Sequence, residues 1–316
     1  GSTNPFAPGV APGSELISIR VLDGNGSGDS FTLARGIIAA VNEGAEVINM
    51  SLGGYSSSRV LEEAVAYAHE RGVVLVSASG NDGQGRVTYP AAYPTVIGVS
   101  AVDANGNRAP FSNFGGGIDV AAPGFQINAV WDEDQFIAFD GTSASAALVS
   151  GLAARVLQNG TARTPDEVRQ LIRDQANEAG PPDADPQFGA GIVNAERLEQ
   201  VGSSGVFDMA LADLYPATEE SDGATFPLYI SLQNRGTEFV PETSLEILVN
   251  GTPYYYRFSG LNAGASESIQ IPVSEADLES EEGYGVSARV TLPDAYEDER
   301  PENDNGSIRL RKVPGG

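Results

Sequence analysis

Strand-like and helix-like patterns alternate over the first two hundred residues. Five apolar runs have the length of buried strands, and they lie at 15–22, 47–52, 73–77, 96–102 and 118–121. Segments with apolar residues at helical spacing lie at 30–43, 59–71, 141–157, 164–176 and 194–200. Nearly continuous apolar strands that alternate with helices predict an α/β fold, a parallel sheet flanked by helices. The working residues of such sheets lie beyond the carboxyl ends of the strands.

The pattern changes in the last third of the chain. From residue 206 helical spacing disappears, and short alternating runs lie at 226–232, 245–249, 254–258, 268–273, 284–292 and 307–310. Turn sequences such as Asn250-Gly251 separate these runs, which predicts an all-β sandwich. The small polar residues at 202–205 read as a linker. We therefore expect a first domain at 1–201 and a β-sandwich domain at 206–316.

Composition excludes several classes of protein. The net charge is −25 and Lys312 is the only lysine, so the chain lacks the basic surface that nucleic-acid binding needs. There is no cysteine, which excludes disulfides, thiolate metal sites and cysteine nucleophiles. No apolar run reaches the roughly 18 residues of a membrane span. The acidic, lysine-poor composition is compatible with a secreted, extracellular or periplasmic location.

Gly141-Thr-Ser143 opens a run of small residues that continues as a helical pattern. A serine in the first turn of a helix lies among free backbone N–H groups and the positive end of the helix dipole. A developing oxyanion beside it would be stabilised there. The alternative is that Thr142 or Ser143 simply caps the helix.

Eight blocks of the first domain, in order and spacing, resemble the subtilisin-like serine proteases over about 9–201. They are Gly9-Val-Ala-Pro12, Val47-Ile-Asn-Met-Ser-Leu-Gly-Gly54, Val74-Leu-Val-Ser-Ala-Ser-Gly-Asn81, Tyr89-Pro-Ala-Ala-Tyr-Pro94, Phe111-Ser-Asn-Phe-Gly115, Asp119-Val-Ala-Ala-Pro-Gly124, Gly141-Thr-Ser143 and Phe188-Gly-Ala-Gly191. The resemblance implies that Ser143 is the nucleophile. It further implies that the Asn81 side chain and the Ser143 N–H are the two donors to the oxyanion.

The resemblance also implies a polypeptide substrate or peptide ligand, bound as a strand between two segments. These segments are Gly26, Ser27 and Gly28 on one side and Ser51, Leu52 and Gly53 on the other. Ala78, Ser79 and Gly80 would line the pocket for the residue before the scissile bond.

The chain departs from the family pattern because it lacks the histidine that acts as the catalytic base and the aspartate that orients it. The family order is Asp, His, Ser, and the blocks that carry Asp and His belong upstream of Gly9. His69, the only histidine, lies in a helix that the resemblance places behind the sheet, so we expect no catalytic role for it. Ala144-Ser-Ala-Ala-Leu148 also replaces the family's usual Met-Ala-Ser/Thr-Pro-His. We therefore expect this chain alone to be inactive.

The same departure leaves a gap in the expected sheet. In the family the strand that bears the aspartate lies between the strands expected at 16–22 and 47–52. Unpaired backbone groups there would cost roughly 1–3 kcal/mol each if buried. We expect the slot to be filled by an upstream segment, a second chain or a rearranged strand; otherwise the isolated chain is poorly stable.

Calcium is common in the family, but no metal is assigned. The family's tightest site uses a loop that here is reduced to 2–8, and Asp119 matches a weaker cation position. The acidic stretch 297–304 is a further calcium candidate, although its spacing does not match an EF-hand and a solvated loop is the simpler interpretation.

The last domain resembles the CARDB-type or Ig-like accessory sandwiches of bacterial extracellular proteins, and a stabilising or spacing role is its simplest interpretation. Three hypotheses for the whole chain follow. It is the C-terminal part of a serine endopeptidase, a non-catalytic relative that binds peptides or acts as a scaffold, or an adhesive protein in which the sandwich does the work.

Overall fold

The computed structural model describes residues 9–132, 135–279 and 283–312, and the chain divides into two compact units. Unit 1 comprises Gly1–Ala176 and Pro186–Leu198, and unit 2 comprises Asn177–Asp185 and Glu199–Gly316. The segment Asn177–Asp185 belongs to unit 2 although it precedes the stretch 202–205. Each unit is described by itself below.

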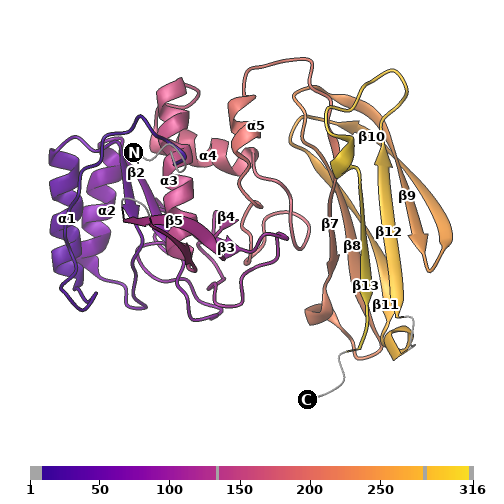
Figure 1. The fold of residues 1–316 in the computed structure, drawn as a ribbon, viewed down its shortest axis with the longest axis horizontal. Coiled ribbons are helices and arrows are strands. Elements are labelled where there is room, and N and C mark those ends of the chain that lie inside the picture. The colour runs from indigo at the N-terminus through magenta and orange to yellow at the C-terminus, as the bar shows by residue number, and fades with distance from the viewer. Residues whose placement is uncertain (1–8, 133–134, 280–282, 313–316) are drawn as a thin grey trace. The chain divides into compact units, whose positions relative to one another are not determined.

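Unit 1 is built on a four-stranded parallel sheet in the order β1-β2-β3-β4 (Figure 1). The strands are β1 (Val47–Met50), β2 (Val74–Ala78), β3 (Ile97–Val102) and β4 (Val120–Pro123). All residues of β2 and β3 are buried, as expected for strands covered on both faces. The predicted α/β fold with a parallel sheet and flanking helices is confirmed.

Helices cover both faces of this sheet. Successive side chains of a strand point to opposite faces, so neighbouring residues of β2 pack against different helices. Leu75 of β2 packs in a core with α1 (Ser30–Asn42) and α2 (Arg59–Glu70). Its neighbours Val74 and Val76 pack in a second core with α3 (Thr142–Asn159) and α4 (Pro165–Asp174). A short helix, α5 (Ala195–Glu199), follows.

Local capping residues set where two of these helices begin. Asp29 caps α1 by accepting the N–H groups of Phe31 and Thr32. Thr164 and Glu167 form a capping box at the start of α4, within the helical segment expected at 164–176.

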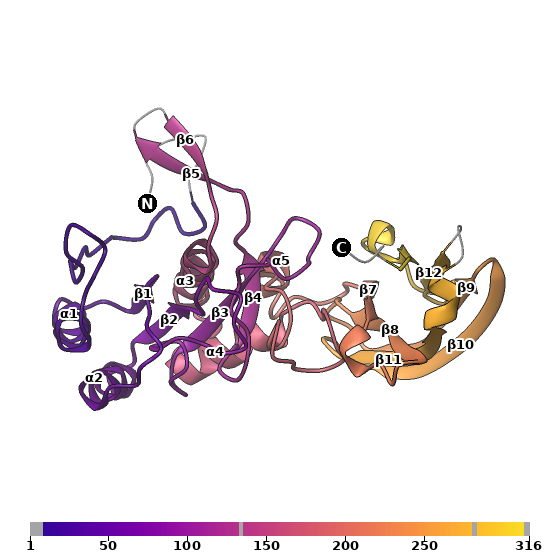
Figure 2. The ribbon, with the colours of Figure 1, turned by 90° about the horizontal axis from the view of Figure 1, so that it is seen from below.

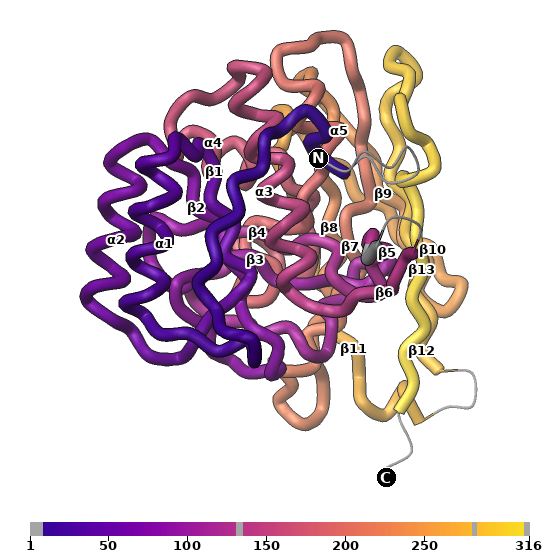
Figure 3. The backbone as a smooth tube through the Cα atoms, turned by 60° about the vertical axis from the view of Figure 1, so that its left-hand side comes forward, coloured from indigo at the N-terminus to yellow at the C-terminus, as the bar shows by residue number. Residues whose placement is uncertain are grey.

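Residues 15–22 form no strand, so the strand predicted there is wrong. A strand needs a ladder partner, and among the described residues β1 pairs only with β2. The segment instead runs past the free side of β1, from one helix layer to the other (Figure 3). Val10 packs against Gly151 of α3, so that a Cβ on this glycine would lie only 2.7 Å from the Val10 Cβ. Val21 packs against Gly36 of α1, where a Cβ would lie only 2.3 Å from the Val21 Cγ1. Glycines therefore allow both contacts.

A hairpin that the sequence pattern did not predict leads into α3. Its strands, β5 (Ile127–Asp132) and β6 (Gln135–Phe139), pair with each other and project from the body of unit 1 (Figure 2). Phe136 and Phe139 are 47% and 40% exposed, so the hairpin presents apolar surface close to the start of α3.

Unit 2 is a pair of antiparallel sheets around one apolar core. The predicted run of short strands is confirmed as additional antiparallel sheets, with β7 as a strand that the pattern missed. One sheet has the order β10-β9-β12-β13 and the other β11-β8-β7. The strands are β7 (Met209–Pro216), β8 (Thr225–Asn234), β9 (Val240–Val249), β10 (Thr252–Leu261), β11 (Ser266–Ser274), β12 (Tyr284–Thr291) and β13 (Asn305–Leu310).

Candidate active site

The nucleophile candidate lies in the first turn of α3, as the small-residue run suggested. The helix begins at Thr142 after Gly141, whose φ of 155° an L side chain rarely adopts. A Cβ on Gly141 would also lie 3.3 Å from the Asn81 amide nitrogen. Neither Thr142 nor Ser143 is the N-cap of the helix, because that position is occupied by Gly141 and both residues lie inside the first turn. The capping alternative is therefore wrong.

Asn81 is held against this turn through its amide oxygen. The backbone N–H and the hydroxyl of Thr142 both donate to Asn81 Oδ1, each at 2.9 Å. A backbone N–H can only donate, so the atom beside it must be the oxygen, and the amide N–H₂ faces the other way. The N–H of Ser143 lies in the same first turn, where a helix offers it no acceptor. The Asn81 amide nitrogen and the Ser143 nitrogen both lie close to Gly141, at 3.3 and 3.7 Å from the point where a Cβ on that residue would be.

Ser51, at the carboxyl end of β1, is bonded to the nucleophile candidate in both directions. Its hydroxyl donates to the Ser143 carbonyl at 2.9 Å, and the Ser143 hydroxyl donates to the Ser51 carbonyl at 3.4 Å. Asn49 Nδ2 donates to the Ser51 hydroxyl at 3.0 Å, and the Ser150 hydroxyl reaches Asn49 Oδ1 at 3.1 Å. A hydrogen-bonded chain therefore ties the end of β1 to α3.

The other predicted substrate-binding residues fall into two groups. Ala78 and Ser79 are buried at the end of β2, where Thr88 donates its hydroxyl to both carbonyls. Gly53 lies beside them, since a Cβ there would meet Thr88 Oγ1 at 2.4 Å. The same Thr88 lies 3.0 Å from a Cβ on Gly80. The segments 51–53 and 78–80 are thus close together.

The glycine-rich loop Gly26, Ser27 and Gly28 forms the second group. Its hydrogen bonds go to Asp23, whose side chain accepts the Ser27 N–H at 2.9 Å. It borders a cavity of about 520 Å³ that is also lined by 20–23, Asp29 and Thr32. Within the described residues, the structure shows no hydrogen bond between this loop and Ser51, Asn81 or Ser143.

Comparison with known proteins assigns the family. The model of the peptidase S8, subtilase family matches residues 1–191, more than half of the chain. This chain belongs to the subtilase family. It is 42% identical over 192 residues to a thermostable alkaline protease of Halalkalibacterium halodurans, which is 61% of this chain and 52% of that protein. It is 40% identical over 188 residues to subtilisin Savinase of Lederbergia lenta, which is 60% of this chain and 69% of that protein.

Solved structures of subtilases agree with the fold. The self-cleaved protease domain of PatA matches with a TM-score of 0.56 at 31% identity, over 64% of this chain and 78% of that one. A lanthipeptide protease matches with a TM-score of 0.54 at 26% identity, over 58% of this chain and 69% of that one. The chain spans about half the length of the first of the curated relatives above, so the activity of a complete protein is treated below as a proposal.

His69 of this subtilase is bonded away from Ser143. Its Nε2 lies 3.0 Å from Asp166 Oδ1 in the first turn of α4, and its side chain is 21% exposed. The hydrogen-bond partner of the Ser143 hydroxyl is a carbonyl oxygen instead. That carbonyl cannot remove the hydroxyl proton, so the Ser143 hydroxyl bonds a weak acceptor where a nucleophile would need a base.

The Asp119 position does not fit a cation, although its carboxylate is only 1% exposed. Arg169 and Arg173 of α4 both lie within 3.0 Å of its Oδ1, and the Gly98 N–H donates to Oδ2 at 3.0 Å. The two guanidinium groups supply the positive charge that a metal would bring. In the part of the chain that the structure describes, no three His, Asp or Glu side chains are grouped to hold a metal, and residues 2–8 lie outside that part.

Two features of the site escaped the sequence. Thr142 was considered only as a cap, yet it orients Asn81. Tyr55 donates to Asp82 Oδ2 at 2.6 Å and accepts from Asn113 Nδ2 at 2.9 Å, so the segment after Gly53 is fastened to the loop after Asn81. The hydrogen bond to Asp82 raises the pKa of Tyr55. The position of Thr142 directly before Ser143 is the sequence feature that could have indicated its role. No sequence feature indicated the role of Tyr55.

Proposed function

We propose that this chain is the nucleophile-bearing and oxyanion-binding part of a subtilisin-like serine endopeptidase, and that it does not hydrolyse peptides by itself. The observation that carries the proposal is the Asn81–Thr142 bond, which holds the Asn81 amide oxygen against the helix turn that carries Ser143 and leaves the amide N–H₂ free to donate elsewhere. Ser143 would attack the scissile carbonyl. Asn81 and the Ser143 N–H would stabilise the oxyanion that forms.

The base would come from outside the described residues. His69 is bonded to Asp166, so an imidazole for Ser143 has to be supplied by a further segment, together with the aspartate that orients it. The place for that segment is the free side of β1. The Leu16 and Ile17 side chains, which lie on the segment running past β1, are 79% and 43% exposed, and an unpaired strand edge favours the addition of a strand.

A complementation experiment tests this proposal. A subtilase segment that carries the Asp strand and the His helix is co-refolded with the chain, and hydrolysis of a chromogenic peptide is followed. We expect activity only in the mixture, a rise in the melting temperature of the chain and no activity with Ser143→Ala. Activity of the chain alone, or an inert mixture in which the segment is bound, would contradict the proposal.

The second candidate is a non-catalytic protein that binds peptides. The contact of the Ser143 hydroxyl with a carbonyl favours it, because the segments 51–53 and 78–80 need no base to pair with an extended peptide. The two candidates differ in the complemented mixture: a peptide-binding protein binds the chromogenic peptide and leaves it intact.

For unit 2 we propose an Ig-like or CARDB-type stabilising or spacing module, with a domain boundary at 202–205. An extracellular location of the complete protein is also part of the proposal. The absence of cysteine and the acidic composition are compatible with it. Among the described residues, no helix has the length and hydrophobicity to cross a membrane.

A further inference from the structure

The segment Asn177–Asp185, here called the strap, lies on the β11-β8-β7 sheet of unit 2. Each strand of that sheet supplies one anchor. Gly180 N–H donates to Asp213 Oδ2 of β7 at 2.7 Å, and Glu178 N–H donates to Gln233 Oε1 of β8 at 3.0 Å. Ser266 of β11 donates its hydroxyl to Glu178 Oε2 at 3.3 Å.

These anchors lie on the sheet face opposite the apolar core. The core side of β8 is formed by Leu228, Ile230 and Leu232, so Gln233 points the other way. Ser266 pairs directly with Gln233 across the strands and shares its face. The strap is therefore a polar cover that hydrogen bonds hold in place, without apolar burial of its own in that core.

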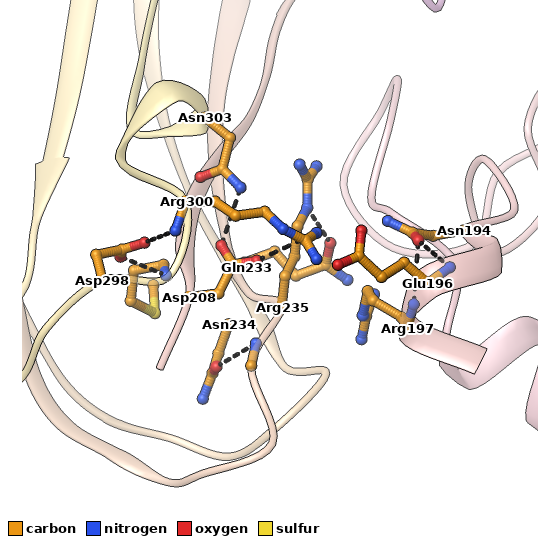
Figure 4. A network of polar contacts seen from close by, with 12 residues as sticks. Asn194, Glu196, Arg197, Asp208, Gln233, Asn234, Arg235, Asp298, Arg300 and Asn303 are labelled. Carbon is orange, nitrogen blue, oxygen red and sulfur yellow. Dashed lines mark hydrogen bonds and ion pairs between the residues drawn. The ribbon is translucent and has the colours of Figure 1, made fainter. Parts of the chain in front are cut away.

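Like charges surround the carboxyl group of Glu178, which is 7% exposed. Asp183 and Asp185 on the strap and Asp213 on β7 all act on it, and each raises its pKa. The cation that faces this group is Arg235, directly after β8, whose Nε donates to Gln233 Oε1 at 3.2 Å (Figure 4). Arg235 is also attracted to Asp208, so its charge is shared. An ionised Glu178 would therefore be a third carboxylate, with Asp208 and Asp213, to act on the Arg235 guanidinium group.

Water has access to the outer half of the strap. A cavity of about 440 Å³ lies among Pro182 and Asp183 of the strap, Tyr229 of β8 and residues 266–270 of β11. If Glu178 leaves the sheet, its carboxylate gains hydration and moves away from Asp213 of β7. Both neighbours of the strap along the chain, Ala176 and Pro186, belong to unit 1, so a released strap is a nine-residue loop tethered at both ends.

We propose that the strap is a pH-operated latch, docked on the unit 2 sheet while Glu178 is protonated and released when Glu178 ionises. Burial raises the pKa of Glu178 from 4.5 to about 7 in the docked state. The docked state therefore binds the proton more tightly than the released state. Docking is strongest below about pH 4.5, weakens as the pH rises to about 7 and then levels off.

Hydrogen exchange of the full chain tests the latch. With a pKa of 4.5 in the released state and about 7 in the docked state, the docking constant falls about 70-fold between pH 5 and pH 8. We expect protection of the strap amides, corrected for intrinsic exchange rates, to fall by that factor while protection of β8 stays constant. Strap protection that does not depend on pH in the unmodified chain would overturn the proposal, and this result needs no variant.

Two variants assign the effect to Glu178. Glu178→Gln keeps the shape and the acceptor for Ser266 but cannot ionise, so we expect its strap protection to change less than threefold between pH 5 and pH 8. Glu267→Gln removes an exposed neighbouring carboxylate on β11 and should behave as the unmodified chain. A Glu178→Gln profile that still falls about 70-fold, with β8 protected, would assign the titration to another group and refute the latch.

Discussion

Thr142 donates two hydrogen bonds to one atom of Asn81, from its backbone N–H and from its hydroxyl, each 2.9 Å long. The two residues are far apart in the sequence, and this contact joins the loop after β2 to the first turn of α3. Because the amide oxygen is occupied, the amide N–H₂ is left to meet a developing negative charge. In the function proposed above, this contact orients the Asn81 donor for the oxyanion.

In the complemented enzyme, Asn81→Ala should lower kcat by about 10²–10³ and leave KM nearly unchanged. That factor is the one known for loss of the asparagine donor in a subtilisin, the family of this chain. Thr142→Val keeps the backbone donor and loses only the hydroxyl, so we expect a loss in kcat of about tenfold. Steady-state kinetics on a peptide substrate separate the two parameters. A rise in KM at constant kcat would assign Asn81 to ground-state binding instead.

Gly151→Ala tests the path of the segment that runs past β1. Alanine is favoured over glycine inside a helix by about 0.5–1 kcal/mol, but its Cβ would lie 2.7 Å from Val10. Val10 lies on a segment that belongs to no helix or strand, so we expect the segment to be displaced. The unfolding free energy should change little, and proteolytic cleavage within 9–22 should become several-fold faster. Limited proteolysis with mass spectrometry measures this. Because the nearest atom is the Val10 Cβ, the rescue is Val10→Gly, and the double variant should be cleaved no faster than Val10→Gly alone. Unchanged cleavage in the single variant would place the segment elsewhere.

Asp119→Asn should destabilise unit 1 by about 2–4 kcal/mol, because it leaves Arg169 and Arg173 without their buried carboxylate. The control residue, Asp166, lies on α4, the helix that carries Arg169 and Arg173. Asp166→Asn removes a 75% exposed carboxylate that faces His69, and we expect a loss of about 0.5 kcal/mol or less. Denaturant unfolding followed by tryptophan fluorescence or circular dichroism compares them. Equal losses for the two variants would show that the Asp119 cluster contributes no more than a surface pair.

Asp304 should make unit 2 less stable as the pH rises towards 7. Its side chain is buried, one carboxyl oxygen has no partner, and burial raises its pKa to about 7. The folded state therefore binds the proton more tightly, so this contribution to stability is present below about pH 4 and is lost as the pH rises through 7. Asp304→Asn should flatten the pH dependence of the unit 2 melting transition. A variant with the slope of the unmodified chain would assign that slope to other groups.

Two carboxylates near Asp304, those of Asp208 and Asp298, accept hydrogen bonds, and we expect them to contribute less than Asp304 to the pH dependence of unit 2 stability. Asp208 receives the Asn303 amide at 2.9 Å and faces Arg300 at 3.7 Å, while Asp298 accepts the Arg300 and Met209 N–H groups (Figure 4). These acids have donors, whereas Asp304 Oδ1 has none among the described residues. Burial raises the pKa of Asp208 as well, but its donors oppose the shift.

The sequence predicted the layers of unit 1 because its strands are nearly continuous apolar runs and its helices carry clear stops, such as Gly44 and Gly72. It failed at 15–22, where an equally apolar run has no neighbouring strand to pair with. Apolar character identifies a segment that would be buried in a sheet, but only a partner makes it a strand. The β5-β6 hairpin was missed because its alternation is weak, and β6 is largely exposed.

The site was predictable as far as residue type and order allow. Ser143 and Asn81 were found through their motifs, and the structure brings them to one helix turn. The role of Thr142 depends on which atom of Asn81 faces it, and that is a property of the folded geometry alone. The strap shows the same limit, because only the fold reveals that Asp183, Asp185 and Asp213 act on the buried Glu178.

The measurement that tests the account most directly is labelling of the isolated chain with a fluorophosphonate probe, which reacts with a serine only when a base activates it. The account predicts no labelling of Ser143 in the chain alone, and labelling once a segment with the Asp and His is bound, with Ser143→Ala as the blank. Labelling of Ser143 in the chain alone would contradict it, because it would show that the 316 residues already contain the base.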